Sequence, residues 1–485
     1  MENLDDKYEI VVGLEVHAQL MTKTKAFSAD PYTYGTAPNT QVSPQNMGHP
    51  GTLPKPNMEA LQLALKMGIA CNCDAHERTY YARKNYFYAD LPKGYQVTQF
   101  TKPLFTGGYI AIKDAKGKEK RISLDKIIME EDSGKSIHDL DPFASLIDLN
   151  RAGVPLIEIV SNPDIRLPEE AGQYLTEVRQ IVRYLDICDG NMEEGSLRCD
   201  ANVSVRLRGT NVLNTRCEIK NLNSIRNVQR AIAAEAKRQM ELVETGGKVT
   251  NDTRGFDPVK GETFPMRSKE LANDYRYFPE PDIPPIVVTE NDVARVKSMM
   301  PELPKSLMAR FIKDYGLSEY DAAVITSEKE YALYYQDLLK HTVNYKAAAN
   351  WLNGPIRSYL NENAIELGSI KITPEQIAEM IRLVDDNKIS ISAASQKVFP
   401  ELLLKEFTGS VKTLVEEMNL IQVDDAGMIN DLIKEVLNFY PDKVAEYKAG
   451  KKGVLGLFMG DIMKKSKGKA DPKMTNRLLL EELEK

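Results

Sequence analysis

A regular alternation of apolar and polar residues marks two neighbouring segments near the middle of the chain. From Leu197 to Arg208 every second residue is apolar or small, and the residues between them are polar or charged. The alternation resumes from Arg216 to Lys220, after a stretch, 209–214, that is typical of a hairpin connection. A period of two predicts strands with one buried and one polar face, so we expect a strand pair here.

The polar face of this predicted pair is crowded with charge. It carries Asp200, Asn202, Glu218 and Lys220, with Glu193 and Glu194 at its entrance. Carboxylates packed this densely repel one another unless a cation lies among them. Oxygen ligands of this kind suit Mg²⁺ or Mn²⁺ better than zinc. A divalent metal site therefore fits these residues, and so does a solvated strand face with ordinary ion pairs.

Two other segments contribute candidate metal ligands. Tyr8 to Leu20 also alternates with a period of two, which places Glu15 and His17 on one face of a predicted strand. Ile122 to His138 contains a second acidic cluster, Glu130 to Asp132. A carboxylate and an imidazole placed like Glu15 and His17 can share a metal ion. An ordinary surface pair is the simpler interpretation of these two residues in isolation.

Helical patterns flank the charged strand pair. Pro168 begins a predicted helix with an acidic first turn, and this helix is expected to end near Gly190. A second helix follows the pair, with Asn223 or Ser224 as its cap, and extends to Gly246.

The start of the second helix adds a candidate phosphate site to the candidate metal site. The residues that lead into it are Lys220, Asn221, Asn223 and Ser224. A helix N-terminus is a natural seat for a phosphate, because its free backbone N–H groups point at the ligand. Carboxylates for a metal and a helix end for a phosphate then lie side by side, which favours a metal–nucleotide site.

The character of the chain changes beyond Pro301, where strand patterns give way to amphipathic helices. The fold class expected is α+β, with an antiparallel-sheet N-terminal domain followed by all-helical domains. We expect three domains, which span residues 1–295, 296–405 and 406–485. The Pro-rich run from Pro279 to Pro285 precedes the first boundary.

Three stretches are candidates for binding nucleic acid. Arg83 to Phe100 mixes aromatic residues, cations and a turn, which fits either a grip on phosphates and bases or a rigid packed loop. Arg267 and Arg276 belong to a second basic and aromatic stretch. Near the C-terminus the candidates are Lys464, Lys465, Lys467 and Lys469. The net charge of -7 argues against binding over the whole surface, but a local basic run can still bind, and a solvated charged face explains the lysines equally well.

Composition limits the class of protein. A hydrophobic fraction of 42% and a charged fraction of 27% are those of a soluble globular protein. The first residues are acidic and contain no apolar core, so we expect no signal peptide, and no apolar run approaches a membrane span. The 5 cysteines are odd in number and irregularly spaced, which favours reduced thiols and a cytoplasmic location.

Taken together, these segments resemble a known family over essentially the whole chain. The matching blocks are Val12–His17, Arg83–Tyr88, Met129–Asp132, Gly153–Asp164, Met192–Asn202, Lys220–Ser224 and Asp274–Pro281. In this order they resemble the B subunit of the aspartyl/glutamyl-tRNA(Asn/Gln) amidotransferases. The resemblance implies a cradle-like catalytic domain at the N-terminus, which binds ATP, Mg²⁺ and the acceptor end of the tRNA, and a tRNA-contacting domain in the basic tail.

The resemblance also implies an activity. A misacylated Glu-tRNA(Gln) or Asp-tRNA(Asn) is phosphorylated on its side-chain carboxylate by ATP, and ammonia then displaces the phosphate. The cofactors implied are ATP and Mg²⁺. The catalytic and metal-binding residues implied are Glu15, His17, Glu131, Asp200 and Glu218. The nucleotide neighbours expected are Glu130, Glu193, Glu194, Lys220, Asn221, Asn223 and Ser224.

The same resemblance implies partners. The chain has no glycine-serine-rich amidase signature, so ammonia must come from an amidase (glutaminase) partner, and a small third protein is expected to complete a heterotrimer. Ser43 and Asn46 stand where some relatives have a Cys-x-x-Cys pair, so zinc is not expected. Ile128 stands where relatives often have histidine. The alternative function is a non-catalytic tRNA adaptor in such a complex.

Overall fold

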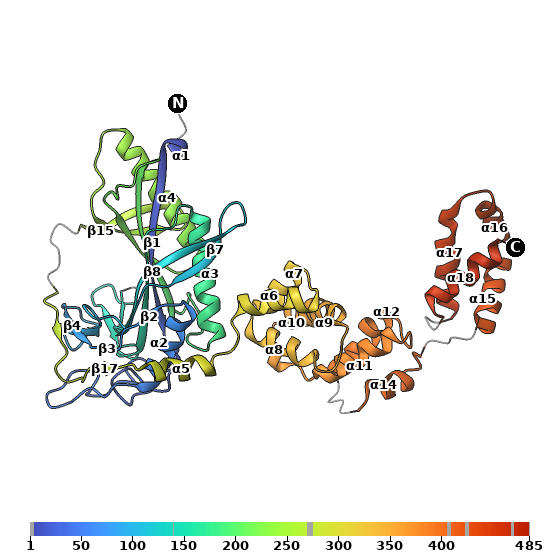
Figure 1. The fold of residues 1–485 in the computed structure, drawn as a ribbon, viewed down its shortest axis with the longest axis horizontal. Helices are drawn as coiled ribbons and strands as arrows, with labels where there is room; N and C mark the ends of the chain where they lie inside the picture. Colours follow the sequence, from blue (N-terminus) through green and yellow to red (C-terminus); the bar gives the residue numbers. More distant parts are fainter. Residues whose placement is uncertain are drawn as a thin grey trace. The chain divides into compact units, whose positions relative to one another are not determined.

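The chain forms two compact units, 1–303 and 304–485, which are described separately. The computed structural model describes residues 4–138, 140–268, 275–404, 409–421, 426–466 and 470–484. In this part of the chain, every strand lies in the first unit and the second unit is built from helices (Figure 1). The predicted α+β class, a sheet domain followed by a helical region, is confirmed. The division into three domains at 295 and 405 stays a prediction.

A large sheet organises the first unit. Its central strands are β13 (Cys217–Leu222), β12 (Leu197–Leu207), β1 (Tyr8–Gln19), β11 (Pro155–Ser161) and β8 (Glu119–Glu131). Towards its edges lie β15 (Glu262–Ser268), β14 (Asp252–Asp257), β6 (Phe105–Thr106), β2 (Asp74–Ala75) and β7 (Tyr109–Lys113). The order is β15-β14-β13-β12-β1-β11-β8-β6-β2, and β7 pairs with β8. These pairings are antiparallel except for β13 with β14, which is parallel.

The predicted strand pair forms with the predicted faces. In the β12–β13 ladder Asn202 lies opposite Glu218, and in the β1–β12 ladder Glu15 lies opposite Asp200. The strand predicted from Tyr8 to Leu20 is β1, which ends one residue earlier. Since side chains alternate across a strand, this register gathers the charged positions of three strands on one face.

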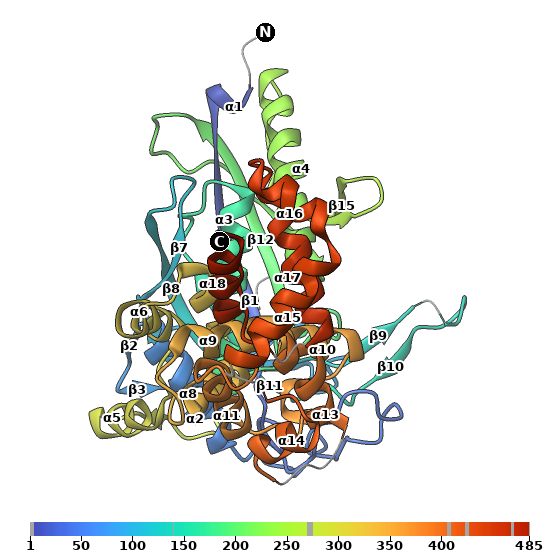
Figure 2. The same cartoon turned by 90° about the vertical axis from the view of Figure 1, so that its right-hand side faces the viewer.

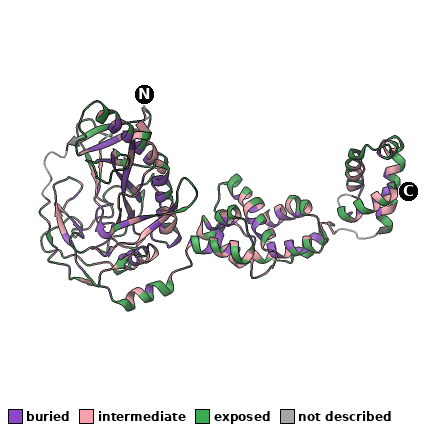
Figure 3. Ribbon diagram, turned by 45° about the horizontal axis from the view of Figure 1, so that its top comes forward, coloured by how far each residue is buried: buried purple, intermediate pink, exposed green. Residues whose placement is uncertain are grey.

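Two helices cover the opposite, apolar face of the sheet. They are α3 (Pro168–Tyr184) and α4 (Ile225–Glu244), which contact each other and both pack on β1. The core between these helices and the sheet is fully buried, and Figure 3 shows much of the central strands as buried. Its members include Val12, Leu14, Val16, Tyr174, Leu175, Val178, Val203 and Ile232. Burial on this scale fixes the polar face as a rigid platform.

The ends of these helices differ in how well sequence anticipated them. Ser224 caps α4 as expected, because its side chain accepts a hydrogen bond from the backbone N of Asn227. The prediction that the first helix ends near Gly190 is wrong, since α3 ends at Tyr184. Asp186 adopts a left-handed φ of 54°, which a right-handed helix cannot accommodate.

Smaller elements surround the sheet. A three-stranded sheet contains β16 (Phe278–Pro279), β4 (Ala82–Asn85) and β5 (Tyr95–Thr98). The strands β9 (Lys135–Ile137) and β10 (Leu146–Asp148) form a hairpin that extends away from the sheet (Figure 2). Short pairing also joins β3 (Arg78–Thr79) and β17 (Ile286–Val287). The remaining helices of the first unit are α1 (Leu4–Lys7), α2 (Met58–Ala70) and α5 (Glu290–Met299).

The second unit consists of short helices in its described part. They are α6 (Pro304–Tyr315), α7 (Glu319–Thr326), α8 (Lys329–Leu338), α9 (Tyr345–Trp351), α10 (Arg357–Asn363), α11 (Pro374–Asp385), α12 (Ile391–Ala393), α13 (Phe399–Leu404), α14 (Val411–Glu417), α15 (Ala426–Phe439), α16 (Pro441–Lys448), α17 (Leu455–Lys465) and α18 (Pro472–Leu483). A separate core near the C-terminus contains Ile433, Phe458 and Leu479. Among the described helices of the whole chain, none has the length and apolar character needed to cross a bilayer.

A buried carboxylate joins α4 to the edge of the sheet. Glu235 is completely buried and lies 3.2 Å from the guanidinium of Arg254 on β14. It also accepts hydrogen bonds from Arg238 at 2.6 Å and from Thr263 on β15 at 2.7 Å. Burial alone opposes the charge of Glu235, but these hydrogen bonds outweigh burial and hold its pKa below the usual range.

We expect Glu235→Gln to destabilise the first unit by about 3 kcal/mol, because it leaves the buried Arg254 without its charged partner. Chemical denaturation of the full chain measures this. Glu241→Gln, at an exposed position on the same helix, is the matched control and should stay within about 0.5 kcal/mol of the parent. Equal stabilities of the two variants would contradict the role given to Glu235.

Candidate functional site

A polar pocket of about 550 Å³ opens on the charged face of the sheet. Side chains from five adjacent strands line it. They include Glu15 and His17 from β1, Glu130 from β8, Glu158 from β11, Asp200 from β12 and Glu218 from β13. In the described part of the chain, these six residues form two groups whose ligand atoms lie close enough together to hold a metal ion.

The first acidic group consists of Glu15, Asp200 and Glu218. Their nearest ligand atoms all lie within 4.8 Å of one another. The strand register explains this, because Glu15 lies opposite Asp200 and Asn202 lies opposite Glu218. Asn202 donates a hydrogen bond of 2.9 Å from Nδ2 to Oε1 of Glu15, which orients that carboxylate.

A lysine lies inside this first group. Lys220 Nζ is 2.6 Å from Oδ2 of Asp200 and 3.0 Å from Oε1 of Glu218. Burial by itself would lower the pKa of Lys220, but the two carboxylates outweigh burial and raise that pKa above its usual range. The ammonium therefore neutralises part of the charge that a divalent cation would otherwise balance.

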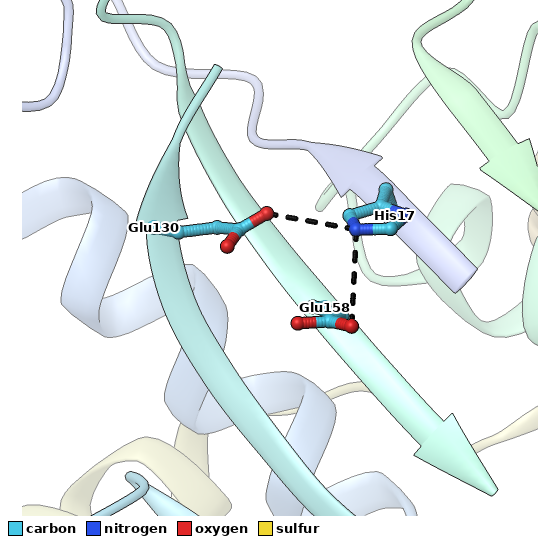
Figure 4. Close-up of side chains that lie close together, drawn as sticks. All are labelled: His17, Glu130 and Glu158. Atoms are coloured by element: carbon cyan, nitrogen blue, oxygen red, sulfur yellow. Dashed lines mark ion pairs between the residues drawn. The ribbon is translucent and has the colours of Figure 1, made fainter. Parts of the chain in front are cut away.

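The second group consists of His17, Glu130 and Glu158 (Figure 4). The imidazole Nε2 of His17 lies 3.6 Å from Oε1 of Glu130 and 3.9 Å from Oε1 of Glu158. In the β1–β11 ladder His17 is directly opposite Glu158, and β8 brings Glu130 from the far side of β11. Burial raises the pKa of Glu130 and that of Glu158 to about 7, so both bind protons readily when no cation is present.

Glu158 lines the pocket although it was not among the residues expected there from the sequence. It lies within the apolar run of β11, where Ile157 and Ile159 point into the core. A lone carboxylate in the middle of a buried strand was the available signal, because such a charge is costly unless it has a partner. The partner, His17, is far away in sequence, so only the pairing of β11 with β1 identifies it.

The structure brings Glu130, rather than Glu131, to His17. Consecutive residues of β8 face opposite sides of the sheet. Glu131 is 2% exposed, forms an ion pair with Lys93 and accepts a hydrogen bond of 2.9 Å from the backbone N of Val97. It therefore lies outside both acidic groups, whereas Glu130 belongs to the second one, and the expected role of Glu131 as a metal ligand stays a prediction.

Some of the residues expected beside the nucleotide line the pocket, and others do not. Lys220, Asn221 and Asn223 line the pocket, next to the N-terminus of α4. Ser224 is occupied as the cap of that helix. Glu193 and Glu194 are exposed and lie outside the lining of the pocket, although Met192 and Gly195 on either side of them contribute to it.

An ion pair between Arg198 and the buried Asp132 also lines the pocket. Arg198 donates a hydrogen bond of 2.7 Å to Asp132, which also accepts one of 2.8 Å from Gln19. Burial alone would raise the pKa of Asp132, but Arg198 and Arg151 outweigh it and lower that pKa. Asp132 is thus ionised and paired, which distinguishes it from Glu130 two residues earlier.

The expected RNA-contacting residues are only partly described. Lys467, Lys469 and the side chain of Arg267 lie outside the described residues. Lys464 is exposed, and Lys465 forms a 2.6 Å ion pair with Glu435. Arg276 is exposed and has a left-handed φ of 43°.

Ser43 and Asn46, at the positions compared above with a Cys-x-x-Cys pair, join a hydrogen-bonded cluster. The Ser43 hydroxyl donates to Oδ2 of Asp30 at 2.6 Å, and Asn46 donates to the same oxygen. Ser28 donates to it as well, at 2.9 Å. The residues of this loop therefore satisfy one another, and the expectation about zinc stays a prediction.

The donor set of the pocket fits a hard divalent cation. Carboxylate oxygens dominate both acidic groups, and a single imidazole joins the second one. Oxygen-rich sites of this type suit Mg²⁺ or Mn²⁺. The carboxylates of Glu130 and Glu158 are also buried enough that their ionised forms need a nearby positive charge.

Comparison with known proteins identifies the family. Residues 10–294 match the family described as the GatB/GatE catalytic domain, and residues 333–483 match the GatB domain. The chain is 47% identical over 480 residues to the B subunit of the aspartyl/glutamyl-tRNA(Asn/Gln) amidotransferase of Caldanaerobacter subterraneus subsp. tengcongensis, covering 99% of this chain and 100% of that protein. It is 46% identical over 477 residues to the B subunit of the same name from Persephonella marina, covering 98% and 99%. The chain therefore belongs to the family of B subunits of aspartyl/glutamyl-tRNA(Asn/Gln) amidotransferases.

Proposed function

We propose that this chain carries out the ATP-dependent transamidation of misacylated Glu-tRNA(Gln), Asp-tRNA(Asn) or both, as the B subunit of an amidotransferase. One observation carries the proposal. Five adjacent strands bring two groups of metal-ligating side chains into one pocket beside a helix N-terminus. An amino acid carboxylate, a nucleotide phosphate and a divalent cation can meet in such a pocket.

The chemistry requires activation of a poor electrophile. A carboxylate resists attack by ammonia because it is negatively charged and lacks a leaving group. Transfer of the γ-phosphoryl group of ATP to the carboxylate oxygen breaks the bond to the β,γ-bridging oxygen, releases ADP and leaves an acyl phosphate. Attack by ammonia then forms the amide, with loss of a proton from nitrogen, and releases phosphate. Both steps concentrate negative charge, which positively charged groups in a confined site stabilise.

Each acidic group has its own role in this proposal. Glu15, Asp200 and Glu218 would hold Mg²⁺, and His17, Glu130 and Glu158 would hold a second divalent cation. Bound Mg²⁺ supplies charge neutralisation for the phosphoryl group that is transferred. Lys220 and the N-terminus of α4 lie where they can bind phosphate oxygens. Glu131 lies outside both groups and is assigned a structural role with Lys93.

The proposal includes partners. Ammonia is scarce at neutral pH, so an amidase partner must release it from glutamine, and a small third protein would complete a heterotrimer. The tRNA body would contact the basic tail near Lys464. An acidic pocket repels RNA unless cations occupy it, so the pocket itself supports catalysis rather than a purely adaptor role.

We expect Glu218→Gln to lower aminoacyl-tRNA-dependent ATP hydrolysis and amide formation by about 100-fold or more, because it removes one charged ligand of the first group. The complex reconstituted with its amidase partner is assayed separately on Glu-tRNA(Gln) and Asp-tRNA(Asn). Glu169→Gln, at an exposed position on α3, is the control and should keep full activity. Unchanged activity in Glu218→Gln would leave only the adaptor function.

We expect the Mg²⁺ affinity of the second group to rise by about tenfold between pH 6 and pH 8. Protons occupy Glu130 and Glu158 below their raised pKa of about 7, and Mg²⁺ must displace them. Affinity therefore increases as pH rises through 7 and levels off above it. Calorimetric titration measures this, and Glu158→Gln should weaken binding and flatten the pH dependence. An affinity independent of pH would refute the assignment.

We expect Lys220→Met to increase Mg²⁺ affinity at the first group by about tenfold, because the competing ammonium is removed. The metal-free variant should also melt at a lower temperature than the parent, and Mg²⁺ should reverse that loss. Lys237→Met, at an exposed position on α4, is the control. If Lys220→Met binds Mg²⁺ no better than the control, Lys220 does not compete with the cation.

A further inference from the structure

Aromatic rings form a continuous row beside the pocket. In order they are Tyr88, Tyr86, Tyr275, Tyr277 and Phe100. Successive ring centroids lie 5.6, 6.0, 6.0 and 4.0 Å apart, and Phe100 stacks flat on Tyr277 with an interplanar angle of 1°. We call these five rings the aromatic row.

The aromatic row is held on the three-stranded sheet. Residues 86–100 and 275–277 are far apart in sequence, and Asn85 at the end of β4 joins them. Its backbone N donates to the carbonyl of Tyr275 at 3.0 Å, and its side chain donates to the carbonyl of Arg276 at 2.8 Å. The row is therefore a built structure rather than a chance contact of surface rings.

The row connects the pocket with the protein surface. Tyr275 lines the pocket, together with Lys84, whose Nζ lies 4.9 Å from the centre of the Tyr275 ring. At the two ends of the row, Tyr88 is 52% exposed and Phe100 is 51% exposed. Burial, and after it the negative charge of Glu130, raises the pKa of Tyr86, which is consistent with a ring close to the second acidic group.

A row of rings that is exposed at both ends, with Lys84 against the inner rings of Tyr86 and Tyr275, suits an unpaired nucleic acid strand. Nucleobases stack on aromatic side chains, and cations near the rings attract the phosphates that join the bases. The sequence left two interpretations of 83–100 open, a grip on bases or a rigid packed loop. The structure combines them, because the inner rings are packed and the end rings are exposed.

The geometry of the substrate indicates which part of the RNA lies near the aromatic row. It is the 3′ end, which carries the amino acid. The amino acid is esterified to the terminal ribose, and its side chain is shorter than a nucleotide. When its carboxylate reaches the acidic groups, the terminal ribose must lie at the mouth of the pocket. Elsewhere the lining includes ion pairs such as Asp132 with Arg198 and Asp200 with Lys220. Tyr275 is the aromatic residue among the described residues that line the pocket, and it joins the pocket to the rest of the aromatic row.

We propose that the aromatic row binds the unpaired nucleotides at the 3′ end of the aminoacylated RNA, by stacking bases on the exposed rings of Phe100 and Tyr88. This inference rests on the proposed function and adds the residues that position the acceptor end. These are positioning residues, since they act on the nucleotides and not on the reacting carboxylate. The row would also be sequence-tolerant, because every base offers a face for stacking.

The test uses the complex reconstituted with its amidase and small partners. The probe is an aminoacylated tRNA that carries 2-aminopurine at its terminal unpaired nucleotide, whose fluorescence falls when it stacks. We expect the parent to quench the probe, Phe100→Leu and Tyr88→Leu to reduce quenching, and both to raise the KM for tRNA by about tenfold. Their kcat at saturating tRNA should change by less than about twofold, because the reacting groups are untouched.

Matched variants separate stacking from other effects. Phe100→Tyr and Tyr88→Phe keep a ring and should behave like the parent. Tyr320→Leu, which removes a 76% exposed ring from α7, should also leave quenching and KM unchanged. Full quenching and an unchanged KM in Phe100→Leu and Tyr88→Leu would overturn the proposal.

Two further outcomes are distinguishable. If the leucine variants no longer copurify with the amidase partner, the row is a protein interface and the proposal is wrong. Quenching is measured without ATP, so it reports stacking even if the complex proves inactive. An inactive parent complex that still quenches the probe would contradict the proposed function, but it would support base stacking on the aromatic row.

Discussion

Repulsion between carboxylates on one face of a sheet is the constraint on which this structure depends. One carboxylate oxygen from each of Glu15, Asp200 and Glu218 lies within 4.8 Å of the others. The same holds for one ligand atom from each of His17, Glu130 and Glu158. Like charges at such distances are unfavourable in a partly buried site. Two features reduce the repulsion. Lys220 lies between the carboxylates of the first group, and the raised pKa values of Glu130 and Glu158 allow the second group to bind protons.

The opposite face of the same sheet makes this arrangement possible. Its residues are fully buried beneath α3 and α4, and interiors packed in this way resist local relaxation. Because side chains alternate along each strand, a rigid apolar face fixes the polar face as well. The acidic groups cannot move apart without disturbing the core, so the repulsion between their carboxylates is retained in the folded protein.

The site also shows how neighbouring carboxylates acquire different properties. Glu130, Glu131 and Asp132 are consecutive, yet one faces His17, one is paired with Lys93 and one is paired with Arg198. The pKa of Glu130 is raised and that of Asp132 is lowered, because only Asp132 has guanidinium groups close enough to outweigh burial. Environment, rather than residue type, assigns their roles. The aromatic row adds a third kind of environment. It places tyrosine rings and Lys84 beside the acidic residues of the pocket.

By itself, the sequence determined the features that depend on local periodicity. The period of two located β1, β12 and β13 and the face of each strand, the capping residues located the start of α4, and the loss of strand patterns beyond Pro301 located the helical region. Glu15, Asp200 and Glu218 were found in this way, since each lies on the polar face of such a strand. The tertiary structure decided which strands are neighbours. It paired Glu158 with His17, turned Glu131 away from the pocket, ended α3 at Tyr184 and joined residues 86–100 to 275–277. The physical reason is that periodicity fixes the side on which a residue lies, whereas partners far apart in sequence are chosen by the packing of the whole sheet.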